Sequence, residues 1–260
     1  MKLCFSTLGC SERELSQILA LASDFNIKAL EIRGIGGELN NGKIKDLTDA
    51  EAERTISAFN KFGIAPTVLG TSCAFHSEER YEGAITEGKE SILIASRLNI
   101  PYIRVFGNNL IPPEKVCYDR IIKGIDILCE FAKDKGVGVL LEVHGDFNTR
   151  ERLKPITDSL LHRDNFGLIW DVGHTHTPYG DRWQDFYREM KGCVKHIHVK
   201  DKSGDKLTQI GKGDIPLRDI LYKLSEDGFD GCISLEWERK WHPELEPIEK
   251  ALAEFKKLFE

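Results

Sequence analysis

The sequence lacks the features of a disulfide-stabilised or membrane-spanning protein. Its seven cysteines are an odd number and include no Cys-x-x-Cys pair, which argues against a disulfide framework or a thiolate zinc site. The longest apolar runs, such as 137–143 and 165–170, are far shorter than the roughly 20 residues that cross a bilayer. The first residues also lack the sustained apolar stretch and cleavage site of a signal peptide. These absences predict a cytoplasmic protein whose cysteines are mostly buried small hydrophobic residues.

The chain also lacks an excess of positive charge. Its 36 Lys and Arg are outnumbered by 42 Asp and Glu, the formal net charge is -6, and no stripe of basic residues occurs. The electrostatic footprint of a tight nucleic-acid binder is therefore missing. We expect a small-molecule partner, with neither nucleic acid nor membrane.

No low-complexity segment, linker or short-period repeat divides the 260 residues. The composition, 41% hydrophobic and 30% charged, is that of a globular protein long enough to bury its own core. Because nothing marks a boundary, a single domain over residues 1–260 is the simplest prediction.

Eight short apolar segments recur along the chain, and each has the length of a buried strand. The predicted strands are residues 3–7, 29–32, 64–69, 102–106, 137–143, 166–170, 194–199 and 232–237. Segments with helical spacing of apolar residues lie between them, for example 15–22 and 248–255, and Ser11 with Glu14 has the spacing of a capping box. No Gly-x-Gly-x-x-Gly follows the first strand, so the eight units predict a (β/α)8 TIM barrel rather than a doubly wound sheet.

Polar residues end the last four predicted strands, which is where the active site of such a barrel lies. They are Glu142 with His144, Asp171 with His174, His196 with His198 and Lys200, and Glu236. Because side chains alternate along a strand, an inward Glu142 brings His144 inward. By the same rule an inward His198 brings His196 below it and Lys200 above it. All of these side chains can therefore converge on one cavity.

Three carboxylates in one cavity would repel one another unless a cation lay between them. Glu142, Asp171 and Glu236 together with His198 offer mainly oxygen and one nitrogen. Such a set suits one divalent cation, with Mn²⁺ first and Mg²⁺, Co²⁺ or Zn²⁺ as alternatives. The sequence thus predicts a metal site made by these four residues.

Further residues are expected near the mouth of the barrel, each with a structural alternative. Glu31 and Arg33 end the second strand and His76 follows the third, so they either line the mouth or close its rim as an ion pair. Lys200 meets an anion or pairs with a neighbouring carboxylate.

Two segments are candidates for covering the mouth. Residues 201–214, with three glycines, are long for a barrel turn and form either a lid over substrate or a mobile surface loop. Residues 237–242 carry cations that could confer specificity for a carboxylate or phosphate, or could form an oligomer contact.

Five motifs in the second half of the chain carry a resemblance to a known family. They are Leu-Leu-Glu-Val-His at 140–144, Trp-Asp-Val-Gly-His at 170–174, His-Ile-His-Val-Lys-Asp at 196–201, Gly-Lys-Gly-Asp-Ile-Pro at 211–216 and Gly-Phe-Asp-Gly-Cys-Ile-Ser-Leu-Glu at 228–236. In order and spacing they resemble the xylose isomerase-like sugar phosphate isomerase/epimerase family. That family includes ketose 3-epimerases, inosose dehydratases and endonuclease IV-type repair enzymes. The first half matches in architecture and in pieces such as Ala-Leu-Glu-Ile-Arg at 29–33.

The resemblance implies roles for the residues already selected. The implied metal ligands are Glu142, Asp171, His198 and Glu236. Glu142 and Glu236 would also act as the acid/base pair, and His174 would contact a substrate oxygen. The remaining candidates for substrate binding are His144, Lys200, Glu31 and Arg33. In ketose 3-epimerases an Arg follows the metal-binding His, whereas Lys-Asp-Lys stands at 200–202 here, so a phosphorylated or acidic substrate stays open beside a free ketose.

The expected chemistry is proton abstraction next to a carbonyl through a metal-stabilised enediolate. Epimerisation, aldose-ketose isomerisation and dehydration all begin in this way, and the sequence does not choose among them. We predict a sugar or sugar phosphate isomerase or epimerase with a carbohydrate partner. The alternatives are an inosose dehydratase-like lyase, an endonuclease IV-like DNA repair enzyme with additional metal ligands, and a non-catalytic sugar-binding barrel. A homodimer is expected only because dimers are the commonest assembly.

Overall fold

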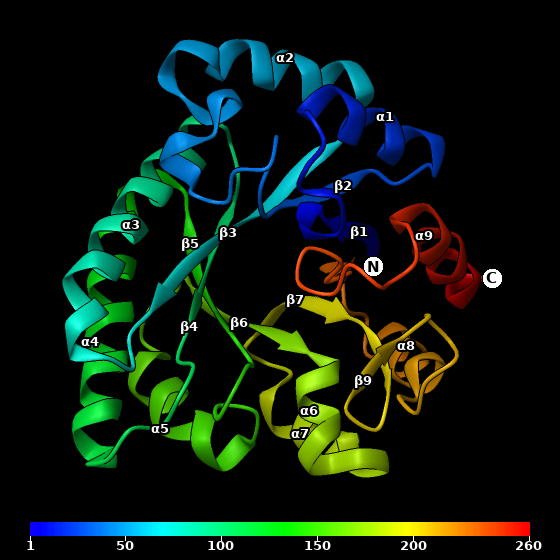
Figure 1. The fold of residues 1–260 in the computed structure, drawn as a ribbon. Helices are drawn as coiled ribbons and strands as arrows, with labels where there is room; N and C mark the ends of the chain where they lie inside the picture. Colours follow the sequence, from blue (N-terminus) through cyan, green and yellow to red (C-terminus); the bar gives the residue numbers. More distant parts are fainter.

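Eight parallel strands close into a barrel in the computed structural model, which describes all 260 residues. Around the barrel the strands follow the order β1, β10, β7, β6, β5, β4, β3, β2 (Figure 1). They are β1 (Lys2–Ser6), β2 (Ala29–Ile32), β3 (Ala65–Ala74), β4 (Tyr102–Phe106), β5 (Gly138–Glu142), β6 (Phe166–Asp171), β7 (Val194–Val199) and β10 (Cys232–Leu235). The predicted (β/α)8 TIM barrel is confirmed.

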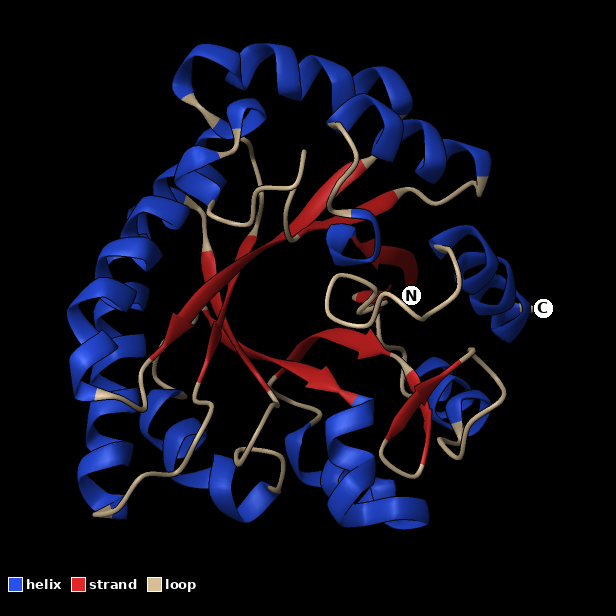
Figure 2. Cartoon of the chain, viewed as in Figure 1, coloured by secondary structure: helices blue, strands red, loops and turns tan.

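Helices surround the strands on the outside of the barrel (Figure 2). They are α1 (Leu15–Asp24), α2 (Ala52–Phe62), α3 (Glu78–Arg97), α4 (Glu114–Ala132), α5 (Arg150–Leu160), α6 (Val172–Tyr179), α7 (Trp183–Met190), α8 (Leu217–Glu226) and α9 (Ile248–Lys256). Short 3₁₀ helices are η1 (Thr7–Cys10), η2 (Asn41–Lys43), η3 (Lys45–Leu47), η4 (Asp49–Glu51), η5 (Lys133–Lys135), η6 (Gly180–Arg182) and η7 (Lys257–Phe259). None of the helices combines the length and apolarity that crossing a bilayer requires.

The hydrophobic core lies between the strands and the inner faces of these helices. Residues 15, 18, 19 and 22 of α1 and residues 248, 251, 252 and 255 of α9, which gave the helical spacing, are all buried. Every cysteine except Cys193 is buried, as predicted for small hydrophobic side chains. Helical periodicity in the sequence therefore identified the faces that pack on the barrel.

The predicted and observed bounds of the barrel strands differ by one or two residues at most, except in β3. β2, β4 and β7 have the predicted bounds, whereas β3 continues past residue 69 to Ala74. Its pairing with β4 shifts register between Gly70 and Ala74, so this end of the strand is irregular. Small and polar residues make up most of it, which is why hydrophobicity alone did not predict it.

The predicted capping box at Ser11 is wrong. Glu14 is the N-cap residue of α1, and its backbone N–H donates to Gln17 Oε1 at 3.0 Å. Ser11 is buried next to η1, which occupies the residues directly after β1. The 3₁₀ turn delays the start of the helix.

The segment 201–214 contains a hairpin of β8 (Asp201–Ser203) and β9 (Lys206–Thr208). Asp201 is buried at its base, and its carboxylate accepts backbone N–H groups from Lys202 at 2.9 Å, Gly211 at 2.8 Å and Gly213 at 3.0 Å. A Cβ at residue 213 would lie 2.1 Å from Asp201 Oδ1, so only glycine fits there. One buried carboxylate thus ties the two ends of this segment together.

Replacing Asp201 by Ala should loosen the hairpin. Several backbone N–H groups lose their acceptor, which we expect to lower the free energy of unfolding by about 1–3 kcal/mol. The amides of Gly211 and Gly213 should then exchange with solvent faster, as measured by hydrogen exchange. Asp205→Ala, in the exposed turn of the same hairpin, is the control and should leave exchange unchanged. Equal exchange in the wild type and in Asp201→Ala would contradict this role.

Candidate active site

The strand register brings the four predicted metal ligands together at the C-terminal end of the barrel. Asp171 on β6 pairs with His198 on β7, and Glu142 ends the neighbouring strand β5. Glu236 follows β10, where its N–H still donates to Val199 O at 2.9 Å. One ligand atom of each of the four lies within 4.8 Å of the others, and all four side chains are buried.

Glu31 orients the imidazole of His198. Glu31 Oε2 lies 2.8 Å from His198 Nε2 and 2.9 Å from His196 Nε2, and Glu31 is fully buried. Burial alone would raise the pKa of Glu31, but the two imidazoles hold it well below its usual range. The ionised carboxylate accepts the Nε2–H, so His198 presents Nδ1 to Glu142 Oε1 at 3.4 Å and Glu236 Oε1 at 3.5 Å. Glu31 thus lies behind His198 and is not among the residues that line the cavity.

Asp171 is fixed by the helix that follows it. Its Oδ1 accepts the backbone N–H of His174 at 2.9 Å as the N-cap of α6. Its Oδ2 lies 2.9 Å from Lys200 Nζ. Burial would raise the pKa of Asp171, but the opposing charge of Lys200 lowers it to about 2. The helix cap therefore turns one carboxylate oxygen toward the cluster.

Lys200 enters the cluster as a buried cation. Its Nζ lies 2.6 Å from Glu236 Oε2 and also contacts Glu238. Burial would lower the pKa of the ammonium, but Asp171, Glu236 and Glu238 raise it well above its usual value. A Cβ at Gly173 would lie 2.6 Å from Lys200 Cγ, so this glycine leaves room for the lysine stem. The prediction that Lys200 lies above His198 in the same cavity agrees with this geometry.

Arg104 is a site residue that the sequence analysis missed. It is buried on β4, and its Nη1 donates to Glu142 Oε2 at 2.9 Å and lies 3.8 Å from Glu236 Oε1. Its Nη2 donates to Thr71 O at 2.9 Å. One guanidinium therefore connects the two glutamates predicted to act as acid and base.

Two sequence signals would have revealed the missed residues. Arg104 stands in the middle of the apolar segment 102–106, where a charge is costly unless it is paired. Glu238 stands two positions after Glu236, the spacing that places side chains on the same side of an extended segment. Neither residue ends a predicted strand, although Glu238 lies in the segment 237–242 that was predicted to cover the mouth.

Glu142 and Glu236 have different ionisation behaviour although both are buried. Burial raises the pKa of Glu236 to about 7 against the opposing charges of Lys200 and His198. Burial also opposes ionisation of Glu142, yet Arg104 and His198 hold its pKa well below its usual range. Arg104 therefore makes Glu142 the more readily ionised of the two carboxyl groups.

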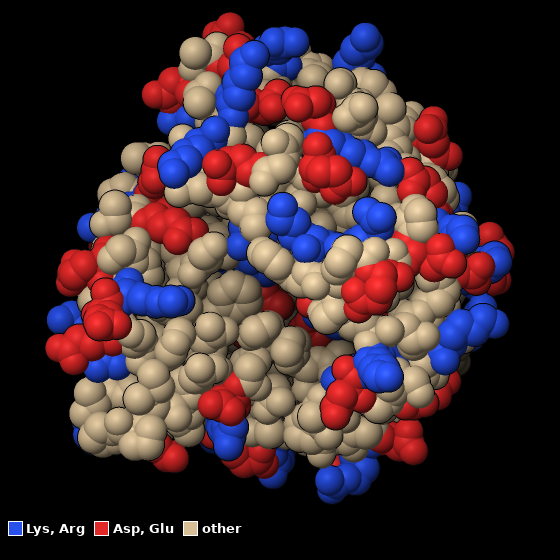
Figure 3. All heavy atoms as spheres, viewed as in Figure 1, with Lys and Arg blue, Asp and Glu red and all other residues tan.

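A cavity of about 240 Å³ opens above this cluster. Its lining residues are Leu8, Arg33, Arg104, Phe106, Asn108, Glu142, His144, Lys200, Glu236, Glu238 and Trp241. Figure 3 shows the face of the molecule hollowed near its centre, with acidic side chains at depth. The cavity has charged groups of both signs on its walls.

Of the two histidines predicted to bind substrate, His144 lines the cavity and His174 packs beside it. The ring centroids of His144 and His174 are 4.2 Å apart, and His144 also packs on Phe106 at 4.9 Å. Burial lowers the pKa of His144 to about 4, so its imidazole is neutral at neutral pH. A neutral imidazole can both donate and accept a hydrogen bond to substrate hydroxyls.

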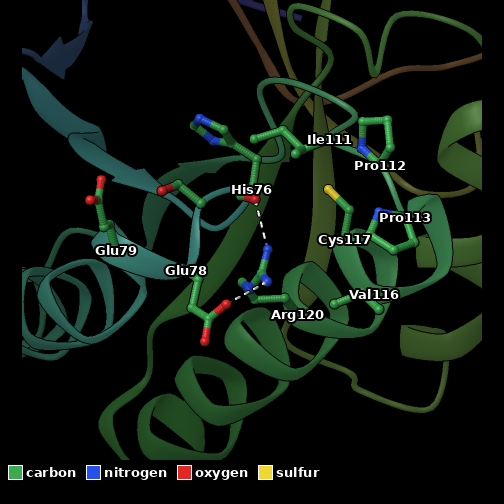
Figure 4. A pocket seen from close by; sticks show the side chains of 10 residues that line it. His76, Glu78, Glu79, Ile111, Pro112, Pro113, Val116, Cys117 and Arg120 are labelled. Carbon is green, nitrogen blue, oxygen red and sulfur yellow. Dashed lines mark hydrogen bonds and ion pairs between the residues drawn. The ribbon is translucent and has the colours of Figure 1, made fainter.

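A second pocket of about 380 Å³ lies outside this site, beside the N-terminal ends of α3 and α4. Arg120 crosses it, donating to His76 O at 2.8 Å, with Glu78 Oε2 at 3.6 Å (Figure 4). In that view the ring of His76 points away from the wall formed by Pro113 and Val116. His76 is therefore separate from the residues that line the barrel cavity.

A closed parallel barrel with three carboxylates and an imidazole at its mouth defines a class of TIM-barrel proteins. The chain belongs to the xylose isomerase-like TIM barrel family, whose pattern it matches over residues 19–258. This agrees with the resemblance drawn from the five motifs.

Curated relatives match over part of their length. An uncharacterized protein of Methanocaldococcus jannaschii is 31% identical over 128 residues, covering 45% of this chain and 43% of the relative. The fructoselysine 3-epimerase of Shigella flexneri is 21% identical over 164 residues, covering 57% and 56%. The chain thus spans about half the length of the curated relatives it matches.

Solved structures share the whole fold at low sequence identity. The probable 3-DHS dehydratase AsbF of Bacillus anthracis superposes with a TM-score of 0.81 at 17% identity, covering 100% of this chain and 99% of that one. The IOLI protein with a bound zinc atom superposes with a TM-score of 0.79 at 23% identity, and the match covers 100% of this chain and 96% of that one. A D-psicose 3-epimerase crystallised with D-fructose superposes with a TM-score of 0.76 at 16% identity, and the match covers 100% of this chain and 97% of that one.

Proposed function

We propose that the chain is a divalent-metal-dependent isomerase or epimerase of a sugar or sugar phosphate, working by proton abstraction next to a carbonyl. The observation that carries the proposal is the donor set of Glu142, Asp171, His198 and Glu236 within 4.8 Å. His198 Nδ1 is buried and has no hydrogen-bond partner, while its Nε2 is held by Glu31. An imidazole oriented in this way by a carboxylate is the usual arrangement at a metal centre.

These residues fit one divalent cation. Three carboxylates and one imidazole suit Mn²⁺ first, and Mg²⁺, Co²⁺ or Zn²⁺ as alternatives. When bound, the ion would supply Lewis-acid stabilisation of the negative charge that develops on the carbonyl oxygen of the substrate. The IOLI protein, which shares the fold, was crystallised with a bound zinc atom, and this supports a divalent metal here.

Glu142 and Glu236 would exchange the proton with the substrate carbon. They come from β5 and from the end of β10, strands separated in the barrel by β6 and β7. Substrate between them would meet one carboxylate as the base and the other as the acid. Arg104 holds both carboxylates toward the cavity, and the neutral His144 and its neighbour His174 would bind substrate hydroxyls.

A lyase that dehydrates a hydroxy-carbonyl substrate is the second candidate. It needs the same first proton abstraction and then a proton donor for the leaving hydroxyl. Lys200 Nζ, 2.6 Å from Glu236 Oε2, is a cation inside the cavity that could assist that departure. The structural likeness to a probable dehydratase supports keeping this reaction in the substrate screen.

The endonuclease IV-like alternative has less support. It would recruit His76, His144, His174 and His196 as additional ligands, and of these only His196 belongs to either of the two groups that could hold a metal. Those groups are the four-residue set and the set of Glu31, His196 and His198.

Metal content tests the proposal first. Protein purified without chelator and loaded with Mn²⁺ should hold about one ion per chain by elemental analysis, because a single four-ligand set is present. His198→Ala should strongly lower the Mn²⁺ content per chain, whereas His162→Ala, which changes an exposed histidine, should not. No metal under any loading would refute the mechanism, and about three zinc ions per chain would favour the endonuclease.

Substrate trials in D₂O then separate the reactions. Ketoses, sugar phosphates and inososes should be screened by NMR for deuterium incorporation next to the carbonyl. Epimerisation and isomerisation both introduce deuterium, and the NMR spectrum of the product then distinguishes a stereoisomer of the substrate from its aldose or ketose isomer. Dehydration gives a product that has lost one molecule of water. No exchange and no turnover with any of them would leave a sugar-binding barrel.

A further inference from the structure

Arg33 carries a charge on the wall of the cavity that no carboxylate contacts. The residue is only 8% exposed and follows β2. Its Nη1 donates to Leu39 O and its Nη2 to Ser72 Oγ, both at 3.0 Å. Both acceptors are neutral, and the side chain makes no ion pair. The rim ion pair that the sequence left open between Arg33 and Glu31 is therefore not formed, because Glu31 is bonded to the histidines behind the cavity.

The other two cations that line the cavity are neutralised by contact. Arg104 lies 2.9 Å from Glu142, and Lys200 lies within ion-pair distance of Asp171 and Glu236. Burial and the nearby charge of Arg104 lower the pKa of Arg33 to about 10, against the opposing charges of Glu87, Glu142 and Glu236, none of which is within ion-pair distance of it, so Arg33 is still charged at neutral pH. A buried charge without a counterion is costly, and an anion from outside would remove that cost.

The chain holds Arg33 in a fixed position. Its backbone N–H donates to Thr7 Oγ1 at 2.8 Å, and the Thr7 hydroxyl donates to Gly34 O at 2.7 Å. A Cβ at Gly70 would lie 2.7 Å from Arg33 Cδ, so this glycine leaves room for the arginine stem. A guanidinium held in advance loses little freedom when it binds a ligand.

We propose that Arg33 binds an anionic group of the substrate, a carboxylate or a phosphate, and thereby selects charged over neutral carbohydrates. The planar guanidinium matches both groups and forms strong charge-assisted hydrogen bonds with them. The anion anchors one end of the molecule while its carbonyl end faces Glu142 and Glu236. The orientation of that reacting end rests on the proposed function.

Binding of matched probes tests this selection without turnover. D-fructose and D-fructose 6-phosphate differ only by the phosphate, and inorganic phosphate and acetate probe the anion alone. Trp241 lines the cavity and is 55% exposed, whereas the other three tryptophans are at most 4% exposed, so its emission reports on binding at the mouth. Calorimetry gives an independent Kd. Both measurements are made at constant ionic strength on Mn²⁺-loaded and on EDTA-treated protein.

The wild type should prefer D-fructose 6-phosphate over D-fructose by at least about tenfold in Kd, and Arg33→Gln should reduce this to about twofold or less. Arg33→Lys keeps the positive charge but loses the planar pair of N–H donors, so its preference for D-fructose 6-phosphate should be intermediate. Arg13→Gln is the matched control, because Arg13 pairs with Glu249 away from the cavity, and it should keep the wild-type preference. Thermal melting confirms that each variant is folded.

Two results would overturn the proposal: an equal preference in the wild type and Arg33→Gln, or no binding of any anionic probe up to about 50 mM. Binding of inorganic phosphate but not acetate to the wild type identifies a phosphate ester as the source of the anion, and binding of acetate admits a carboxylate. Retained preference without any turnover would refute the proposed function and leave the Arg33 site standing. Turnover of neutral sugars at a rate that does not depend on Arg33 would support the proposed function and refute the Arg33 site.

Discussion

Glu142→Gln is expected to lower kcat by about 10²–10⁴-fold, the usual contribution of a positioned acid or base. The amide has nearly the same shape as the carboxylate but cannot accept the substrate proton. Metal should be retained in part, because Asp171, His198 and Glu236 are unchanged. The measurement is the steady-state rate with the substrate found in the screen, together with metal content per chain.

The matched control for this variant is Glu226→Gln, at the exposed end of α8. It makes the same chemical change far from the cavity and should leave kcat within about twofold, as expected for an exposed site. Full activity of Glu142→Gln on a verified substrate would refute the assignment of Glu142. Loss of activity accompanied by complete loss of metal would instead show that Glu142 acts mainly as a ligand.

Arg104→Leu is expected to lower the free energy of unfolding by about 3–5 kcal/mol, the usual cost of removing one partner of a buried ion pair. The loss of the guanidinium leaves Glu142 and Glu236 close together in a buried site without their shared cation. Urea denaturation of the EDTA-treated protein measures this effect. Mn²⁺ should restore part of the lost stability, because it supplies positive charge to the same carboxylates.

Two variants give this prediction its controls. Arg54→Leu removes an arginine that is 80% exposed and pairs with Glu51 at 3.3 Å, and we expect a change of less than about 1 kcal/mol. Arg104→Lys keeps the charge and should recover part of the stability. If Arg104→Leu were as stable as the wild type without metal, the ion pair between Arg104 and Glu142 would not stabilise the fold, and this prediction would be wrong.

The ends of the strands were the informative part of the sequence. Glu142, Asp171, His198 and Glu236 each end or follow an apolar run, and the barrel brings them to one level. Alternation along β7 also predicted that Lys200 lies in the same cavity as His198. The sequence could not tell whether Glu31 faces substrate or supports a histidine, since both positions are at the mouth end of β2.

Other features depend on contacts between distant segments. Arg104 belongs to the site because β4 lies beside β5, where Phe106 pairs with Glu142. The segment 201–214 is tied by Asp201 to glycines ten and twelve positions away. Arg33 lacks a counterion because Glu31, two residues earlier, is bonded to His196 and His198 from the other half of the chain.

The sequence by itself determined the number and chain order of the eight barrel strands, the helical faces that form the core, and the set of acids and imidazoles at the strand ends. These depend on periodicity and local alternation, which act over a few residues. Only the tertiary structure decided which oxygen meets which nitrogen, which cations are neutralised, and which charge is left for a ligand. Those outcomes depend on barrel closure and strand register, which bring residues more than a hundred positions apart within hydrogen-bond distance.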